Sequence, residues 1–213
     1  MDRLLLVDSD IFILLGTAGL LDRTAELLGF SPAQLRRLHA LPHMLRGKRM
    51  RREYPEEIRE AALEAAIRVE GIYDRPADGE LPQRLLAVEN IDDGEAALYS
   101  HLAEHRTCLL ASGDLRAIRA LGRAEGFADV RESIRDRVVC LEAAVRLLVE
   151  ADGVDAIATA FRPVIPHNNH LKVFFSEANV RDQNQCLAAV RSYFDSLRQG
   201  SSCDFLYWPP ERE

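Results

Sequence analysis

Three carboxylate residues stand where a metal ion could be bound. Asp8 directly follows the apolar run 3–7 (RLLLV), and Asp114 comes three residues after a second such run, 107–111 (TCLLA). Glu95 lies in the first turn of a predicted helix, in NIDDGEAAL. Ligands of parallel sheets collect outside the carboxyl ends of the strands, and a helix that starts at that edge brings its first turn to the same place. We therefore expect Asp8, Glu95 and Asp114 to share one cleft.

Carboxylates that crowd together need a counter-charge. Like charges held close are costly unless a cation neutralises them, and clustered oxygen ligands suit Mg²⁺ or Mn²⁺. Each residue alone also has a structural interpretation, because Asp after a strand is common in turns and helix caps. A Glu in the first turn of a helix is favoured by the helix dipole. The metal-site hypothesis therefore depends on the three residues together.

The elements around these residues predict an α/β fold. Short apolar runs bounded by polar residues are typical of strands covered on both faces, and this pattern fits residues 3–7, 107–111, 137–141 and, less well, 85–88. Helical patterns begin at Pro55 and run to Gly71, and they recur over 94–105 (capped by Asp92 or Asp93), 115–125 and 142–151. Residues 74–82 (DRPADGELP) are typical of a loop. This alternation predicts three α/β/α layers with a central parallel sheet.

The sequence changes character after Gly153. The segment FRPVIPHNNH is typical of a polar loop, a helix is predicted over roughly 183–199, and the tail SSCDFLYWPPERE carries the only Trp. We therefore expect an α/β domain over residues 1–151 and a mainly helical extension, residues 152–213, packed on it. This extension would act as a lid, as a partner-binding surface or through packing alone.

The composition is that of an ordinary soluble globular chain. Of 213 residues, 47% are hydrophobic and 29% are charged. No stretch approaches the roughly 18 continuous apolar residues that a membrane helix needs, and the first apolar run is too short for a signal peptide. The cysteines match no zinc-site spacing and are expected to be reduced and mostly buried: Cys108, Cys140, Cys186 and Cys203. We expect a cytoplasmic protein that does not contact membranes.

One segment is basic although the chain is acidic. A net charge of −7 excludes nucleic-acid binding through bulk charge, but residues 36–52 contain no acid. Arginine forks pair well with phosphate oxygens, so this segment predicts nucleic-acid contact through Arg46, Lys48, Arg49, Arg51 and Arg52. The alternative is a solvated surface that pairs with the acidic residues just after it: Glu53, Glu56, Glu57, Glu60 and Glu64.

Three short motifs together resemble the PIN-domain family. VDSDIF resembles the opening strand motif of that family, with Asp8 at its first acidic position. IDDGEAAL resembles the second motif, with Glu95 as its acid, and LLASGDLRAI resembles the third, with Ser112 and Asp114 in the Ser/Thr-x-Asp step. Each motif is short, but the three occur in the family's order and in the expected structural contexts. The resemblance covers roughly residues 3–150.

The resemblance implies metal-dependent hydrolysis of phosphodiester bonds, most often in RNA, by a metal-activated water. It gives Asp8, Glu95 and Asp114 the role of ligands to Mg²⁺ or Mn²⁺. It gives Ser112 an orienting hydrogen bond, and it gives Asp10, where the family often has Asn, a supporting contact. An antitoxin-like or other protein partner and a homodimer are also typical of the family.

The sequence departs from the family pattern at the fourth acid. Many members carry one shortly after the third, whereas LRAIRALGR follows Asp114 here. Glu142 or Asp136 could replace it, although Glu142 is equally suited to a helix start. Without a fourth acid, the resemblance implies one-metal chemistry or weak metal affinity.

Three other interpretations compete with this one. His101, Glu104 and His105 match the short zinc-peptidase pattern H-x-x-E-H, but they lie at the end of a predicted helix, where His is favourable anyway. VDSDIF also resembles the D-x-D start of haloacid dehalogenase-like phosphatases, but Phe12 replaces their Thr or Val, and no strand-borne acidic pair follows Lys172. The remaining alternative is a PIN-like module that binds RNA or protein without cutting.

Overall fold

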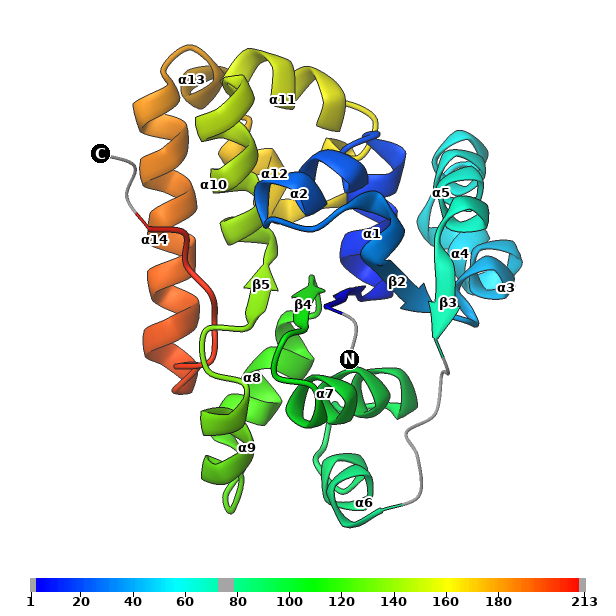
Figure 1. The fold of residues 1–213 in the computed structure, drawn as a ribbon. Helices are drawn as coiled ribbons and strands as arrows, with labels where there is room; N and C mark the ends of the chain where they lie inside the picture. The colour runs from blue at the N-terminus through cyan, green and yellow to red at the C-terminus, as the bar shows by residue number, and fades with distance from the viewer. Residues whose placement is uncertain (1–2, 73–78, 211–213) are drawn as a thin grey trace.

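Five short parallel strands form one sheet in the order β3-β2-β1-β4-β5. The computed structural model describes residues 3–72 and 79–210. The strands are β1 (Leu5–Val7), β2 (Leu35–Leu38), β3 (Glu70–Ile72), β4 (Leu109–Ser112) and β5 (Val138–Cys140). Leu5 of β1 pairs with Leu35 on one side and with Leu109 on the other, and every neighbouring pair is parallel. The predicted α/β fold with a central parallel sheet is confirmed (Figure 1).

The strands form where short apolar runs are buried on both faces. All three residues of β1 are at most 1% exposed, and all three residues of β5 are fully buried. Such continuous burial is what helices on both faces of a parallel sheet produce. Figure 1 shows this arrangement, with α1 (Ser9–Thr17), α2 (Leu21–Leu27) and α10 (Leu141–Asp152) on one side of the strands. On the other side are α6 (Glu80–Leu86), α7 (Asp93–Glu104), α8 (Leu115–Arg123) and α9 (Ala128–Ser133).

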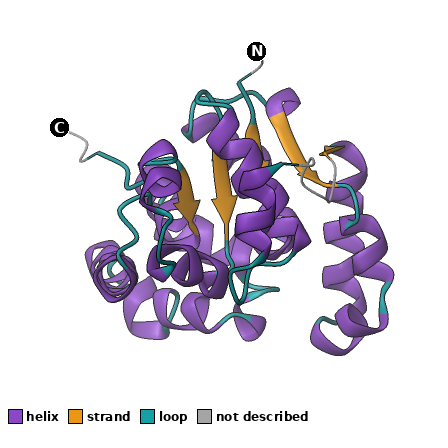
Figure 2. Ribbon diagram, turned by 90° about the horizontal axis from the view of Figure 1, so that it is seen from below, coloured by secondary structure: helices purple, strands orange, loops and turns teal. Residues whose placement is uncertain are grey.

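The direction of winding reverses between β1 and β4. From β1 the chain moves to β2 through α1, α2 and the 3-10 turn η1 (Pro32–Gln34), and then to β3 through α3 (Leu41–Arg46), α4 (Lys48–Glu53) and α5 (Glu56–Arg68). From β4 it moves the opposite way, to β5. Figure 2 shows the strands lengthwise and side by side. Parallel sheets bind ligands at such a reversal, outside the carboxyl ends of the strands.

Strands β2 and β3 were not predicted from the sequence, and the strand predicted over residues 85–88 is wrong. β2 has the sequence LRRL, which lacks an apolar run. Arg37 is nevertheless buried there, and its hydrogen bond to the carbonyl of Ala66 at 2.7 Å compensates for the burial of its polar group. β3 contains Glu70 and Gly71, so the helix predicted to reach Gly71 ends at Arg68 instead. Residues 85–88 were predicted as a strand, but they contain the end of α6, which buries Leu85 as part of an apolar helix face.

The helix starts that were predicted in the first half of the chain are confirmed. Pro55 precedes α5, and Asp92 caps α7, as expected. The predicted loop 74–82 lies in part outside the described residues, and its last residues belong to α6. The helices predicted over 94–105, 115–125 and 142–151 correspond to α7, α8 and α10.

The C-terminal segment packs along the β5 edge of the molecule. It contains α11 (Val154–Phe161), η2 (Ile165–His167), α12 (Asn169–Phe174), α13 (Glu177–Val180) and α14 (Gln183–Ser201), the helix predicted over 183–199. α14 contacts α10 and α8. The tail then pairs with β5, because Tyr207 N donates to Val138 O at 2.8 Å. The predicted polar loop is wrong over Asn169 and His170, which start α12 because the Asn168 side chain caps it.

Two expectations from composition can be compared with the structure. Among the described residues, no helix is long and apolar enough to cross a membrane. All four cysteines are buried thiols that form no disulfide, as predicted. Burial raises the pKa of the Cys186 and Cys203 thiols to about 11, so neither is a ready nucleophile at neutral pH.

Candidate functional site

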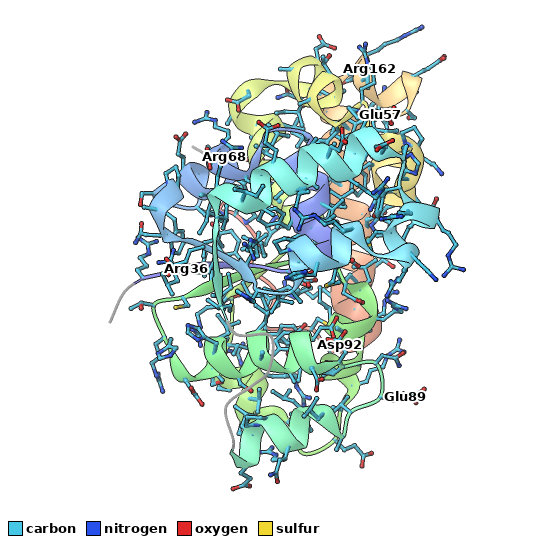
Figure 3. The ribbon with its side chains drawn as sticks, turned by 90° about the vertical axis from the view of Figure 1, so that its right-hand side faces the viewer. Arg36, Glu57, Arg68, Glu89, Asp92 and Arg162 are labelled. Carbon is cyan, nitrogen blue, oxygen red and sulfur yellow. The ribbon has the colours of Figure 1, made fainter. Side chains whose placement is uncertain are left out.

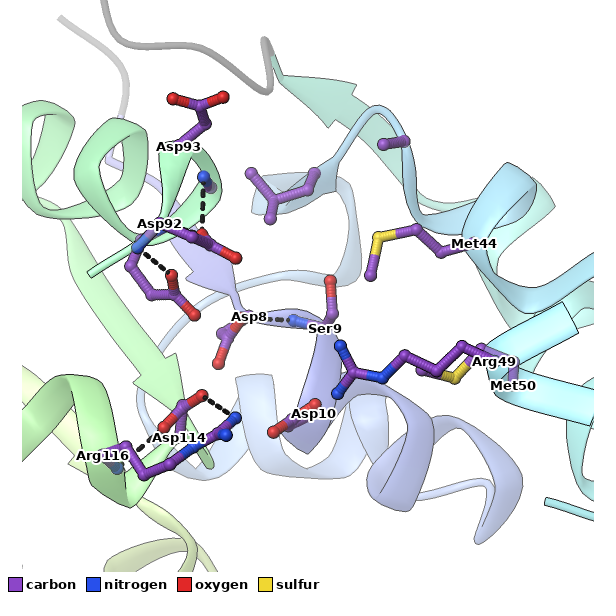
Figure 4. A pocket seen from close by; sticks show the side chains of 14 residues that line it. Asp8, Ser9, Asp10, Met44, Arg49, Met50, Asp92, Asp93, Asp114 and Arg116 are labelled. Atoms are coloured by element: carbon purple, nitrogen blue, oxygen red, sulfur yellow. Dashed lines mark hydrogen bonds and ion pairs between the residues drawn. The ribbon is translucent and has the colours of Figure 1, made fainter. Parts of the chain in front are cut away.

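The predicted carboxylates meet at the carboxyl ends of β1 and β4. They line a cleft of about 290 Å³ at the point where the winding reverses. The cleft is lined by the starts of α1, α7 and α8, the end of β2, and residues of α3 and α4. Figure 4 shows the cleft from close by. Its charged lining residues are Asp8, Asp10, Asp92, Asp93, Glu95 and Asp114, together with Arg49 and Arg116.

Asp8 is held at the floor of this cleft. It caps α1, and its Oδ1 accepts a hydrogen bond from Ser9 N at 2.6 Å. Its Oδ2 accepts one from the Ser112 hydroxyl at 3.1 Å. Burial raises the pKa of Asp8 to about 7, and the neighbouring charge of Asp10 adds to this shift. An ionised Asp8 is therefore costly without a further positive charge in the cleft.

The turn after β4 brings two site residues into contact with the start of α1. Ser112 is buried and, besides its bond to Asp8, accepts a hydrogen bond from Asp114 N at 3.3 Å. Gly113 passes so close to α1 that a Cβ atom there would lie 3.1 Å from Ile11 N and 3.5 Å from Asp10 Cβ. A side chain at this position would push the turn away and separate Asp114 from Asp8 and Asp10.

Asp114 is the N-cap of α8. Its Oδ1 accepts hydrogen bonds from Arg116 N at 2.7 Å and Ala117 N at 3.1 Å, and its Oδ2 faces the Arg116 guanidinium at 3.3 Å. Asp10, in the first turn of α1, stands close to this carboxylate. Burial raises the pKa of Asp10, and the charge of Asp114 raises it further.

Glu95 approaches the cleft from α7. It belongs to a capping box, in which its Oε2 accepts from Asp92 N at 2.7 Å and Asp92 Oδ1 accepts from Glu95 N at 3.0 Å. Gly94 allows this helix start to pack against β2, because a Cβ atom there would lie 2.9 Å from Leu38 Cδ1. Burial raises the pKa of Glu95 to about 9, and the adjacent Asp92 carboxyl contributes to the shift.

The three predicted ligands share a local role. Asp8 and Asp114 are the N-caps of α1 and α8, and Glu95 completes the capping box that Asp92 begins at the start of α7. Three helix N-termini therefore face one cleft, and their partial positive charge favours anions there. Among the described residues, no three His, Cys, Asp or Glu side chains are already arranged to hold a metal ion. The caps use one carboxylate oxygen of each residue, Oε2 of Glu95 and Oδ1 of Asp114, and leave the other oxygen of each outside the capping hydrogen bonds.

The donor set nevertheless fits a hard divalent cation. All the candidate ligands are carboxylate oxygens, which suit Mg²⁺ or Mn²⁺ rather than zinc. The raised pKa values of Asp8, Asp10 and Glu95 show that the protein alone does not compensate their charges. A bound cation would supply that compensation.

Two arginines from different elements also line the cleft. Arg116 lies in the first turn of α8, and Arg49 reaches in from α4 (Figure 4). Both side chains are about 70% exposed, at 71% and 69%. Arg116 was not predicted as a site residue, although its position two residues after Asp114 places it in the first turn of α8. A cleft with acids at the floor and arginines at the mouth can accommodate both a cation and a phosphate.

The other predicted basic residues are exposed and do not line the cleft. Arg46 ends α3, and Lys48, Arg51 and Arg52 belong to α4. The alternative of pairing with the following acids is realised only by Arg49 and Glu53, at 3.6 Å, among the residues that the structure describes. The rest of this basic surface stays available to an anionic ligand.

The structure brings neither proposed fourth acid to the cleft. Glu142 is fully buried at the start of α10, with Oε1 2.6 Å from His170 Nδ1 and Oε2 without a hydrogen-bond partner. Asp136 lies in the turn before β5, at the opposite end of that strand. The additional acids at the cleft are instead Asp10, Asp92 and Asp93.

The H-x-x-E-H motif does not form a metal centre. The His101 and His105 rings lie 4.2 Å apart at the end of α7, and they belong to no metal-binding group among the described residues. Burial lowers the pKa of His101, and the neighbouring His105 adds to the effect.

Comparisons with known proteins add no family assignment. No family model, no curated protein and no solved structure matches this chain.

Proposed function

We propose that this chain is a PIN-like nuclease that uses Mg²⁺ or Mn²⁺ to hydrolyse phosphodiester bonds in RNA. The observation that carries the proposal is the gathering of Asp8, Glu95 and Asp114 around one cleft at the reversal of the sheet. They come from three distant parts of the chain, and the cleft raises the pKa of Asp8 and Glu95. Perturbed carboxylates that converge in a cleft are typical of catalytic sites. The choice of RNA rests on the resemblance of the motifs.

The protein's own groups have distinct tasks in this proposal. Asp8, Glu95 and Asp114 would hold the cation, with Asp10 as a supporting acid. A bound Mg²⁺ or Mn²⁺ supplies Lewis-acid stabilisation of phosphate oxygens and lowers the pKa of a water molecule. Ser112 fixes the orientation of Asp8 through its 3.1 Å hydrogen bond. Since metal binding requires ionised carboxylates, Asp8 and Glu95 must release their protons as the site fills.

The phosphate would be bound at the mouth of the same cleft. Arg49 and Arg116 offer guanidinium forks there, and three helix N-termini add partial positive charge. This arrangement compensates for the net charge of −7, which otherwise repels nucleic acid.

A second candidate function is supported by the capping hydrogen bonds. Glu95 and Asp114 are both engaged at their own helix starts and do not converge with Asp8 into a ready metal site. In a PIN-like module that binds RNA or a protein partner without cutting, these bonds would persist in every state.

A cleavage assay separates the two functions. We expect cleavage of single-stranded RNA that requires Mg²⁺ or Mn²⁺ and falls at least about 100-fold in Asp8→Asn and in Asp114→Asn, because even the outer-shell partners of metal ligands contribute 10–100-fold. Asp22→Asn, a change at an exposed carboxylate of α2, serves as the matched control and should retain activity. If the wild-type protein cleaves diverse RNAs no faster than the double variant Asp8→Asn/Asp114→Asn, the non-cutting module is the correct function.

A further inference from the structure

A row of arginines runs along the exposed face of α8. Arg116, Arg119 and Arg123 are spaced at i, i+3 and i+7, so they share one side of the helix. All three are exposed, whereas Ala117, Ile118 and Leu121 on the other side are buried. The helix itself, LRAIRALGR, contains no acid.

This row carries charge that the protein only partly compensates. Arg116 faces Asp114 at 3.3 Å, and Arg123 donates to the carbonyl of Gly200 at 3.0 Å. Arg119 makes no hydrogen bond or ion pair with a described residue. Like charges one helical turn apart destabilise a helix by about 0.2–0.5 kcal/mol per pair. An arrangement with this cost in an acidic protein indicates an anionic ligand.

The arginines line a groove that continues into the carboxylate cleft. One hollow, of about 390 Å³, lies between Arg119 and Arg123 on one side and the segment 88–90 on the other. A second hollow, of about 290 Å³, is lined by Asn90, Glu95 and Asp114. Arg116 lines both hollows and also the cleft itself. A chain of anionic groups could therefore run from the cleft along α8 without a break.

The chemistry of the groove favours a polyphosphate backbone over bases or peptides. Among the described lining residues of the two hollows and the cleft, none is aromatic, so base stacking contributes little. Repeated guanidinium groups match phosphates, which recur along a nucleic-acid strand. A cleft of about 290 Å³ is close to the lower limit for a small-molecule site and is large enough for one phosphate with part of its nucleotide. Among the described residues, Glu89 is the one acid that lines the outer hollow, whereas Asp92, Glu95 and Asp114 line the inner one.

We propose that the α8 groove, formed by Arg116, Arg119, Arg123 and the segment 88–90, binds the sugar–phosphate backbone of single-stranded nucleic acid next to the phosphate held in the cleft. This inference rests on the proposed nuclease function, because the groove would hold the part of the substrate strand that lies next to the phosphate to be cut. It differs from the basic surface of α3 and α4, which lies on the other side of the cleft with Arg49.

Metal-free binding tests the groove without requiring cleavage. A short fluorescent single-stranded RNA of mixed sequence is titrated with the full chain in EDTA at several salt concentrations, and anisotropy reports binding. Arg119→Ala should weaken binding about tenfold, the effect of losing one charge-assisted contact, and should reduce the slope of log K against log salt by about 0.7. Arg119→Lys should retain the wild-type slope, because it keeps the charge.

A matched arginine far from the groove is the control. Arg162 is exposed after α11, and Figure 3 shows it at the opposite end of the molecule from Asp92. Arg162→Ala removes the same charge and should leave both affinity and slope unchanged. The groove assignment is overturned if Arg119→Ala behaves like Arg162→Ala, or if the duplex of the same sequence binds as tightly as the single strand.

The outcomes for the groove and for the nuclease function are separable. Metal-dependent cleavage together with unaltered binding by Arg119→Ala would remove the groove and leave the nuclease function intact. Binding that depends on Arg119 in a protein that cleaves nothing would support the groove and remove the nuclease function.

Discussion

Among the three candidate ligands, Asp8 is the most deeply buried. Only 5% of its surface is exposed, and two hydrogen bonds, from Ser9 and Ser112, fix its carboxyl group. Burial and the nearby Asp10 raise its pKa from 3.8 to about 7. The folded protein therefore binds a proton at Asp8 more tightly than the unfolded chain does, which links its stability to pH.

The sign of this linkage gives a prediction for the metal-free protein. Between pH 4 and pH 7 the unfolded chain loses the Asp8 proton while the folded protein keeps it, so the free energy of unfolding falls as pH rises. Asp8→Asn cannot ionise and escapes this loss. We expect the stability advantage of the variant over wild type to grow between pH 5 and pH 8 by on the order of 2–3 kcal/mol, because the folded protein still holds the proton up to a pKa of about 7. Urea unfolding in EDTA at both pH values measures the difference.

Exposed carboxylates provide the comparison. Asp22→Asn should give the same small change at both pH values, because Asp22 is exposed in α2. A stability difference between Asp8→Asn and wild type that does not grow from pH 5 to pH 8 would show that Asp8 is not strained in the fold.

At the residue scale, the sequence was informative where chain position alone determines the location of a side chain. Asp8, Ser112 and Asp114 follow strands, so their place at the carboxyl edge could be predicted. The contribution of Arg116 could not, because it depends on how the β4–α8 turn packs over α1 at Gly113. The hydrogen bond that Glu95 accepts in its capping box could not be predicted either, because it depends on the side-chain rotamer and not on the spacing of residues in the sequence.

At the scale of elements, the site is a meeting of three helix starts at one sheet edge. α1, α7 and α8 were positioned by strands β1 and β4, whose apolar runs are easy to recognise. β2 and β3 were missed because their residues include Arg36, Arg37, Glu70 and Gly71, and the parallel pairing of the two strands supplies the missing stability. An ion pair between Arg36 and Glu70, at 2.9 Å, also joins these strands.

Another contact between elements joins α12 to α10 through a buried acid. His170 of α12 lies 2.6 Å from Glu142 of α10, and no described group bonds to the second Glu142 oxygen. Removal of one partner of a buried pair leaves an uncompensated group. We therefore expect His170→Ala to lower the free energy of unfolding by about 1–3 kcal/mol, the cost of leaving a buried acceptor without its hydrogen bond. Chemical denaturation with circular dichroism measures this loss.

A nearby histidine and a second substitution complete the test. His167→Ala, at an exposed position, should cost less than about 1 kcal/mol. Glu142→Leu in the His170→Ala background should recover stability, because a buried pair replaced by apolar residues is often neutral. Equal losses for His170→Ala and His167→Ala would contradict a stabilising role for the pair.

At the scale of the whole molecule, the cleft and the C-terminal segment occupy different places. Every described residue that lines the cleft lies between Asp8 and Arg116. The segment after Gly153 instead packs on α10 and α8 and extends the sheet edge at β5, where Leu206 bridges Val138. Its described residues pack beside the sheet and do not line the cleft. The sequence alone could not predict this position, because it depends on which edge of the sheet α14 covers.

The charge of the molecule is also divided. The chain carries a net charge of −7, yet arginines stand on both sides of the carboxylate cleft, on α4 and on α8. Local basic surfaces can bind an anion that the molecule as a whole repels, and such binding weakens steeply with salt.

The most direct test of the central claim is Mn²⁺ binding to the purified protein, followed by electron paramagnetic resonance of the free ion. We predict saturable binding that tightens as pH rises from 6 to 8, because the cation displaces the Asp8 proton. This binding should be lost in Asp8→Asn/Asp114→Asn and retained in Asp22→Asn. Equal Mn²⁺ binding by wild type and by the double variant, or none by either, would contradict a metal site formed by Asp8, Glu95 and Asp114.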